Sequence, residues 1–567
     1  MLKDLIRQLL LREGRQPISA PSAPARRPTE DDEHFALAQL RQLALDPNAD
    51  ANALLEGYRH ANALKQHDLS LRLLERAAEA RPDDFAIQTN LSVKRKAAGD
   101  LDGALRCSDA AIRLAPDRAE PRYNLGLLLH ELGDHAGAEK LYREAIRIAP
   151  AFEPAQDSLI CLLDQMHGVD PQTMLAQRRE WARRYAGTES CGAHANSRDP
   201  ERVLRIGYVS ADFRGHSSAY FLEPLFAHHD AAKVCVHCYD NWPDEDAVTQ
   251  RLKRLVHAWR DIHALDDERA AALIVADGID VLVDLSGHTL GHRLGVFARR
   301  PAPVQATYMG YLGSTGLPAI RYRISDALLD PPGLTEAMQT ETVVRMRRCC
   351  VCFGPERGVP PPNRLPALQN GALTFGSLNA RTKLNEAVLA LWAKLLIEIP
   401  AARLIMVVDY GAHKAVAKAL RDRFARAGVD PQRIDVRGRQ PLAAYFSIFR
   451  EIDVALDPFP YNGGTTTLHS LWMGVPVITL AGRWALARSG LTIMENARLS
   501  EFVARTEEGY IGIARRCATD LPWLAALRGE LRSRFDAAPF ADAAGTARAL
   551  EAVYRSIWRD WCSSSPA

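Results

Sequence analysis

The stretch DVALDPFPYNGGTTTLHSLWMGVPVITLAG, residues 453–482, joins two short apolar segments through a loop of small residues and a helix-like run. We expect a strand that ends at Leu456, a helix that begins around Thr465, and a second strand in VPVITL. Strand, loop, helix and strand in this order form the unit from which parallel α/β sheets are built. The stretch therefore predicts an α/β fold.

The loop before the expected helix is suited to an anion. The first N–H groups of a helix have no partner within the helix, and they carry a partial positive charge. Gly463 and Gly464 let the backbone approach a ligand, and Thr465 and Thr466 add hydroxyl donors. The loop predicts phosphate binding. Because it contains neither a Walker A lysine nor a GxGxxG pattern, a plain glycine turn with Thr465 as N-cap is the alternative.

The same alternation continues on both sides of this stretch, from Leu204 onward. Strand candidates are LRIGYVS, VCVHCYD, DVLVDLS, PVQATYM, LTFGSL, RLIMVV, RIDVRG, VALDPF and VPVITL. We expect two parallel sheets covered by helices, with a break in GPERGVPPPNRLP, residues 354–366. Ligands of such sheets bind at the C-terminal ends of the strands, so the pattern predicts a site between the two lobes.

The N-terminal half contains a repeat. Pro82, Pro116 and Pro150 close successive segments at a spacing of 34 residues, which is the tetratricopeptide (TPR) period. Ala104 and Ala138 stand at matching positions, where small side chains let helices pack closely. We expect a helical superhelix whose concave face holds peptides or proteins, and a purely structural stack is the alternative.

Composition excludes several classes of protein. The 567 residues contain 71 Lys plus Arg and 69 Asp plus Glu, so we expect no nucleic acid and no membrane surface as partner. Apolar runs are shorter than a bilayer span, and the N-terminal residues differ from a secretory signal, so we expect a cytoplasmic protein. The ten cysteines lack paired metal-ligand spacing and are expected to be buried free thiols.

Four separated motifs carry a resemblance to a known family. They are PERVLRIGYVSADFRGHSSAYFLEPLFAHHD, RRPAPVQATYMGYLGSTG, LTFGSLNARTKLNEAVLALWAKLLIEIP and the stretch quoted first. The whole chain resembles O-linked N-acetylglucosamine (O-GlcNAc) transferases and the related SPINDLY-type proteins. The resemblance implies an α-helical TPR superhelix followed by an α/β two-lobed glycosyltransferase of the GT-B fold, with two Rossmann-like domains.

The repeats, the break between the two sheets and the family resemblance together predict how the chain is divided into domains. We expect a flexible N-terminal arm over 1–30, the TPR domain over 31–195, the N-terminal catalytic lobe over 200–366, and the C-terminal lobe, which binds the nucleotide sugar, over 367–540. A C-terminal helix over 541–567 is expected to pack back on the catalytic region.

The resemblance also implies roles for individual residues. Lys383, in NARTK, matches a lysine that contacts the donor diphosphate, and the loop Asn462 to Thr466 accompanies it. His216 matches a histidine close to sugar and acceptor, and we assign it first to positioning and second to base catalysis, because the donor's own phosphate is the competing base. Thr289 and Gly313 match contacts to the sugar.

Three departures concern the nucleotide. Gly464 replaces a histidine of the animal enzymes, and His469 stands where they place a ribose-binding aspartate. Gln440, Leu442 and Tyr445 occupy a base-contacting segment with different side chains. We expect phosphate, ribose or base contacts from Gln440 and His469, with UDP-GlcNAc as donor and GDP-fucose as the main competitor.

The resemblance implies an enzyme that inverts the configuration at the anomeric carbon of the sugar without a metal ion. We therefore expect no metal site and no cofactor beyond the donor substrate. The triplet Asp244 to Asp246 is expected to be a solvated loop. His288 and His292 have the spacing of zinc ligands on a helix, but no acidic partner accompanies them as in HExxH.

The predicted activity is transfer of GlcNAc to Ser or Thr hydroxyls of proteins held by the repeats. A sugar transferase with another acceptor and a non-catalytic nucleotide-binding scaffold are the rival hypotheses.

Overall fold

The structure is a computed structural model, and it describes residues 30–187 and 190–564. The expected N-terminal arm lies outside these residues, apart from its last position. The chain forms two compact units. One unit consists of residues up to 130 together with 136–155, and the other consists of residues 131–135 together with 156 onward.

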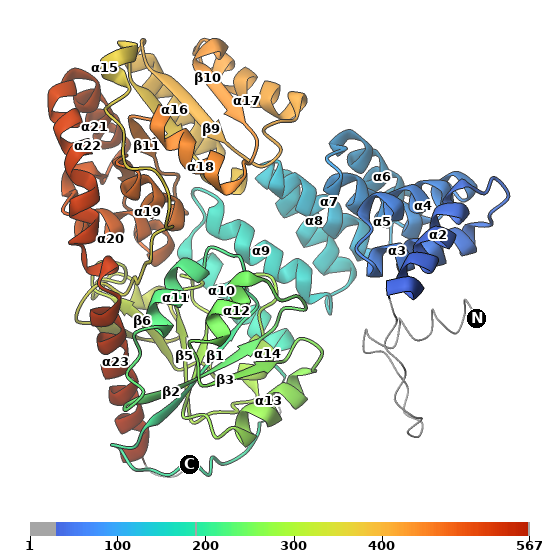
Figure 1. The fold of residues 1–567 in the computed structure, drawn as a ribbon, viewed down its shortest axis with the longest axis horizontal. Helices are drawn as coiled ribbons and strands as arrows, with labels where there is room; N and C mark the ends of the chain where they lie inside the picture. The colour runs from blue at the N-terminus through green and yellow to red at the C-terminus, as the bar shows by residue number, and fades with distance from the viewer. Residues whose placement is uncertain (1–29, 188–189, 565–567) are drawn as a thin grey trace. The chain divides into compact units, whose positions relative to one another are not determined.

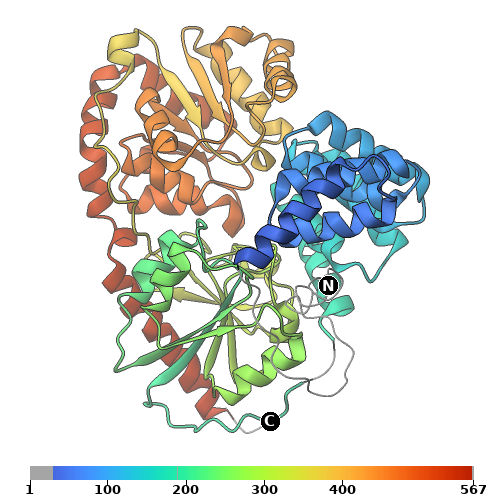
Figure 2. The same ribbon diagram turned by 45° about the vertical axis from the view of Figure 1, so that its right-hand side comes forward.

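The first part of the chain is helical, and Figure 2 shows its helices, in blue, packed side by side. Helices α3, α5, α7 and α9 begin 34 residues apart, as do α4, α6 and α8, so each repeat is a pair of helices. The helices are α2 (Glu30–Leu45), α3 (Ala51–Ala63), α4 (His67–Ala80), α5 (Phe85–Ala97), α6 (Leu101–Leu114), α7 (Ala119–Glu131), α8 (His135–Ile148), α9 (Glu153–Gln165) and α10 (Pro171–Tyr185).

Two parallel sheets follow within the described residues (Figure 1). The first has the strand order β3-β2-β1-β4-β5-β6-β7, so the order reverses between β1 and β4. Its strands are β1 (Leu204–Ser210), β2 (Val234–Asp240), β3 (Ala258–Asp261), β4 (Val281–Asp284), β5 (Val304–Tyr308), β6 (Tyr322–Asp326) and β7 (Thr342–Met346). Helices α11 (Ala219–Phe226), α12 (Ala247–Lys253), α13 (Asp267–Ala276) and α14 (Leu294–Ala298) connect them.

The second sheet has the order β10-β9-β8-β11-β12-β13, which reverses between β8 and β11. Its strands are β8 (Thr374–Ser377), β9 (Arg403–Val407), β10 (Ile434–Arg437), β11 (Val454–Leu456), β12 (Val477–Leu480) and β13 (Val503–Ala504). The helices are α15 (Ala367–Asn370), α16 (Glu386–Glu398), α17 (Lys414–Arg426), α18 (Leu442–Ile448), α19 (Thr465–Trp472), α20 (Ser489–Asn496), α21 (Glu507–Thr519) and α22 (Leu521–Asp536).

In the described part of the chain, two passages join the sheets. The first runs from β7 to α15, and the second runs from α22 to α23 (Ala543–Ser563), which returns to the first sheet beside α11, β5 and β7. The passages bond to each other, because Phe353 N–H donates to the Phe540 carbonyl oxygen over 2.8 Å. On α23, the buried Tyr554 hydroxyl lies 2.8 Å from that of Tyr208 on β1. The last long helix is therefore part of the first lobe's core.

The fold class expected from the sequence is confirmed: a helical repeat region precedes two Rossmann-like lobes. Each of the nine strand candidates contains an observed strand, whereas β3, β6, β7 and β13 were not predicted. All ten cysteines are free thiols, as expected, but the prediction that they are buried is wrong for four of them. Cys191 is exposed, and Cys161, Cys235 and Cys562 are partly exposed. Over the ranges that the structure describes, no helix has the length and apolar character that crossing a membrane requires.

Close packing of the repeat helices generates a stability prediction. The side chain of Ala104 in α6 has no exposed surface, and α6 packs on α5. We expect Ala104→Leu to destabilise the repeats by about 1–3 kcal/mol, because a larger side chain forces these helices apart. Thermal unfolding of the full chain followed by circular dichroism measures the change. Arg106→Leu, at an exposed position of the same helix, is the control, and equal midpoints for the two variants would contradict the prediction.

Candidate functional site

The predicted site residues follow the strands at which the sheet order reverses. His216 follows β1 and Thr289 follows β4, the two strands at the reversal in the first sheet. Lys383 follows β8, and the loop Asn462 to Gly464 follows β11, at the reversal in the second sheet. Connections diverge at such a point and leave a crevice at the strand ends, where α/β proteins bind ligands.

Lys383 lies at the loop that leads into α19. Its Nζ donates a hydrogen bond to the carbonyl oxygen of Asn462 over 2.9 Å, and it lies 4.2 Å from the centroid of the Tyr461 ring. Burial lowers the pKa of Lys383 to about 8, and the charge of Asp457 opposes this shift. The ammonium group is thus held next to the beginning of α19, with a proton that it can lose near neutral pH.

Asp457 is hydrogen-bonded to the same loop from the protein interior. This fully buried carboxylate accepts the N–H of Gly463 over 2.6 Å and the hydroxyl of Thr479 over 2.7 Å. Burial raises its pKa to about 7, while both hydrogen bonds and the charge of Lys383 oppose the shift. Asp457 therefore links the loop, the neighbouring strand β12 and the lysine.

The two glycines have different roles. A Cβ on Gly463 would lie 2.6 Å from Thr467 Oγ1 and 2.9 Å from Asp457 Oδ1, so packing requires glycine there. A Cβ on Gly464 would meet nothing within 4 Å. Gly464 is the N-cap of α19, has no side chain to cap the helix, and precedes Thr465, whose side chain is partly exposed. The open space at a helix N-terminus is the geometry that binds phosphate.

An unsatisfied polar atom borders the same loop. Asn379 Oδ1, which would lie 3.0 Å from a Cβ on Gly463, is buried and has no hydrogen-bond partner among the described residues. A buried amide oxygen without a partner costs free energy unless a ligand or water satisfies it.

His469 occupies an aromatic enclosure one turn into α19. The rings of Tyr220, Phe353, Tyr445 and Phe446 lie 4.9–5.8 Å from its ring, centroid to centroid. Its Nδ1 lies 3.1 Å from the Tyr445 hydroxyl, and burial lowers its pKa to about 4, so it is neutral at pH 7. Tyr220 belongs to α11 of the first lobe, so this contact brings the two lobes together beside α19.

His216 precedes α11, and three groups surround its Nδ1. The Ser218 hydroxyl oxygen lies 3.1 Å from Nδ1, the Ser218 backbone nitrogen 3.3 Å and the Asp212 carboxylate 3.5 Å. Burial lowers the pKa of His216, while the charge of Asp212 opposes this shift. His216 is therefore neutral at pH 7, with its Nδ1 engaged by neighbouring residues.

The two candidate sugar contacts meet around Tyr311. A Cβ on Gly313 would lie 2.7 Å from the Tyr311 ring, which also packs on Gly287, two residues before Thr289. Gly313 lines a small cavity together with Leu486. The carbonyl oxygen of Leu486 accepts the N–H of Asn462 over 3.1 Å, so this cavity adjoins the loop that holds Lys383.

Of the candidates for contacts to the nucleotide base, only one lies against another predicted site residue. Gln440 is exposed, and its amide donates to the carbonyl oxygen of Gly438 over 3.1 Å. Leu442 is 49% exposed at the start of α18. Tyr445, in the next turn of α18, is the member of this segment that contacts His469.

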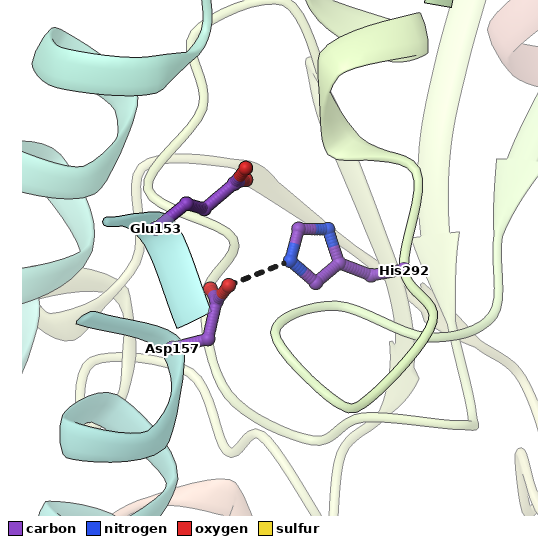
Figure 3. Close-up of side chains that lie close together, drawn as sticks. All are labelled: Glu153, Asp157 and His292. Atoms are coloured by element: carbon purple, nitrogen blue, oxygen red, sulfur yellow. Dashed lines mark hydrogen bonds and ion pairs between the residues drawn. The ribbon is translucent and has the colours of Figure 1, made fainter. Parts of the chain in front are cut away.

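One sequence interpretation needs correction. His288 and His292 lie outside any helix, and their acidic partner is Asp157 of α9: its carboxylate lies 3.1 Å from His288 Nδ1 and 3.0 Å from His292 Nε2. Figure 3 shows the Asp157 carboxylate pointing at the His292 ring.

The triplet Asp244 to Asp246 is exposed and lies outside any helix or strand, so the prediction of a solvated loop is confirmed. Asp246 is in addition the N-cap of α12 and accepts the N–H of Gly215, the residue before His216, over 2.6 Å.

Sequence reasoning missed Asp457, Asn379 and Tyr220. Asp457 had a usable signal, because an aspartate directly after a buried parallel strand stands at the ligand-binding edge of the sheet. Asn379 follows β8 in the same way. No local signal could have paired Tyr220 with His469, since they lie on different lobes.

Paired parallel sheets, each with a reversal of strand order, form the two lobes of a glycosyltransferase of the GT-B fold. Residues 190–351 and 363–547 match the model of glycosyl transferase family 41, and residues 119–152 match a tetratricopeptide repeat model. The chain belongs to glycosyl transferase family 41.

Individual relatives agree with this assignment. A Petunia hybrida protein named as a probable UDP-N-acetylglucosamine–peptide N-acetylglucosaminyltransferase SPINDLY is 37% identical over 393 residues, which are 68% of this chain and 42% of the relative. A Caenorhabditis elegans UDP-N-acetylglucosamine–peptide N-acetylglucosaminyltransferase is 23% identical over 480 residues, covering 64% and 41%. The chain spans less than half the length of these curated relatives.

A solved structure is similar over nearly the whole chain. The structure of a Thermobaculum terrenum O-GlcNAc transferase mutant has a TM-score of 0.83 and 34% identity, and the match covers 93% of this chain and 98% of that one.

The role of Asp457 can be tested directly. We expect Asp457→Ala to destabilise the second lobe by about 1–3 kcal/mol and to speed amide exchange in residues 461–467, because the Gly463 N–H loses its buried acceptor. Hydrogen exchange read by mass spectrometry measures the loop. Asp435→Ala, which removes a partly buried carboxylate from β10, is the control. Unchanged exchange in the Asp457 variant would refute this role.

Proposed function

We propose that this chain is an inverting, metal-independent protein O-glycosyltransferase that transfers GlcNAc from UDP-GlcNAc to Ser or Thr hydroxyls. The observation that carries the proposal is the contact of Lys383 with Asn462, next to the uncapped beginning of α19. The names of the relatives supply the sugar, the nucleotide and the peptide acceptor.

The donor's diphosphate is proposed to lie against the beginning of α19. As the bond between sugar and phosphate breaks, negative charge grows on the leaving phosphate, and a fixed cation and oriented N–H groups stabilise it. Lys383 would supply the cation, and the N–H and hydroxyl groups of Thr465 and Thr466 would supply the donors. Gly464 leaves room for the phosphate, and the unsatisfied Asn379 Oδ1 adjoins the loop.

The acceptor hydroxyl is proposed to approach from the first lobe. Neutral His216, whose Nδ1 is engaged by Ser218 and lies 3.5 Å from Asp212, would meet the sugar, the phosphate or the acceptor oxygen through its Nε2. We assign it first to positioning and second to base catalysis. Thr289 and Gly313 would contact the sugar, and the repeats would present the acceptor protein along their concave face.

His469 and Gln440 are proposed to contact the nucleoside. His469 is neutral where the animal enzymes have an acidic side chain, so it would bind ribose or base as a hydrogen-bonding group without charge. Tyr445, bonded to its Nδ1, fixes the orientation of the ring.

Transfer of labelled sugar to proteins of a cell extract tests the function. We expect label from UDP-GlcNAc, loss of transfer in His216→Ala with UDP binding intact, and loss of both in Lys383→Ala. A lysine facing a diphosphate contributes a charged hydrogen bond, so UDP should bind roughly 10- to 100-fold more weakly without it. Lys394→Ala, which removes an exposed lysine paired with Glu507, is the matched control.

Two results would overturn the proposal. Label from GDP-fucose but not from UDP-GlcNAc would make the chain a fucosyltransferase. UDP binding without transfer from either donor, under saturating conditions, would make it a nucleotide-binding scaffold.

The lowered pKa of Lys383 generates a pH prediction. The diphosphate favours the protonated lysine, and that form is lost as pH rises through about 8. The dissociation constant for UDP should therefore increase above that pH, by up to ~10-fold per pH unit, with proton uptake on binding. Titration calorimetry at about pH 7 and about pH 9 measures both quantities. In Lys383→Arg the guanidinium stays protonated, so the pH dependence should flatten; a wild-type affinity independent of pH would contradict the assignment.

A further inference from the structure

Residues from outside the second sheet contact the short turn that carries Lys383. Lys383 is the last residue of the 3₁₀ turn Arg381–Lys383, between β8 and α16. On one side the lysine reaches Asn462. On its other side the turn contacts the connection between α7 and α8, residues 131–135, which belongs to the same compact unit as the two sheets.

His135 makes the central contact. Its Nε2 lies 2.7 Å from the carbonyl oxygen of Thr382, the residue before Lys383. A carbonyl oxygen only accepts, so His135 donates and carries a proton on Nε2. His135 is 8% exposed, so water competes little for this carbonyl.

Gly133 makes a second contact with the turn. Its φ is +78°, and a Cβ at this position would lie 2.1 Å from Nη1 of Arg381. The guanidinium therefore lies directly against the glycine backbone. The same Nη1 donates to the Leu384 carbonyl oxygen over 2.6 Å, so Arg381 closes the turn around Lys383.

The end of α9 makes a third contact. The amide of Asn385 donates to the carbonyl oxygen of Gln165 over 2.9 Å and to that of Phe459 over 2.6 Å. The ring of His167 packs edge-on against Phe459 at 5.6 Å. Helical-repeat segments therefore support both the lysine turn and the loop that the lysine touches.

We propose that His135 is a positioning residue for Lys383, so that the connection between α7 and α8 supports the donor site. The proposal rests on the function proposed above for Lys383. A phosphate-binding ammonium must stay within a fraction of an ångström of its working position, and residues behind it set that position. The bond from His135 to Thr382 fixes the backbone one residue before the lysine.

The test compares three variants of the full chain. His135→Ala removes the donor to Thr382. His135→Gln retains an N–H donor at the position of Nε2. His60→Ala removes another histidine of the repeats that is equally buried, at 8% exposure, and serves as the matched control.

We expect UDP to bind roughly fivefold to twentyfold more weakly to His135→Ala, the loss that follows from removing one supporting hydrogen bond. The KM for UDP-GlcNAc should rise by a similar factor, and kcat at saturating donor should fall as well, because Lys383 is proposed to stabilise the charge that grows on the leaving phosphate. His135→Gln should recover most of the affinity, and His60→Ala should leave it unchanged. A general loss of stability would affect His60→Ala and His135→Ala alike, and the glutamine variant would not rescue it.

A second measurement needs no nucleotide. The rate at which a small acylating reagent modifies Lys383 in the free protein, followed by mass spectrometry, should change in His135→Ala and return toward wild type in His135→Gln. Wild-type UDP affinity and wild-type Lys383 labelling in His135→Ala would overturn the inference. If the wild-type chain binds no UDP, the proposed function fails, and the labelling rates alone decide whether His135 positions Lys383.

Discussion

A partly buried lysine and a fully buried aspartate hold the loop at the strand reversal of the second sheet. Taking such charges out of water costs on the order of several kcal/mol per ion, so the arrangement persists only where hydrogen bonds replace the lost hydration. Asp457 receives them from Gly463 and Thr479, and Lys383 gives one to Asn462. These bonds also fix the loop that leads into α19, so the two charged groups and the shape of this loop depend on each other.

Burial keeps two histidines of the predicted site neutral at pH 7: aromatic rings enclose His469, and His216 is partly buried before α11. Lys383, with a pKa of about 8, is protonated at that pH. Such a division suits a reaction in which charge develops on a leaving phosphate, because the compensating charge is already in place.

Sequence and structure agree where the signal is local. The start of α19 at Thr465 and the strand that ends at Leu456 follow from apolar periodicity and small residues, which act within a few positions. Long-range partners could not be predicted in this way: Asp157 lies 131 residues from His288, and Tyr220 meets His469 from the other lobe. Strands β3, β6 and β7 were missed because they carry polar or charged residues, and β13 was missed because it has only two residues.

The two passages between the lobes have a mechanical consequence. A single connecting segment leaves two lobes free to rotate about it, whereas two segments bonded to each other restrict that rotation. The hydrogen bond from Phe353 to Phe540 joins the two passages, and α23 anchors the second passage in the core of the first lobe. The double connection therefore restrains the two lobes from twisting relative to each other.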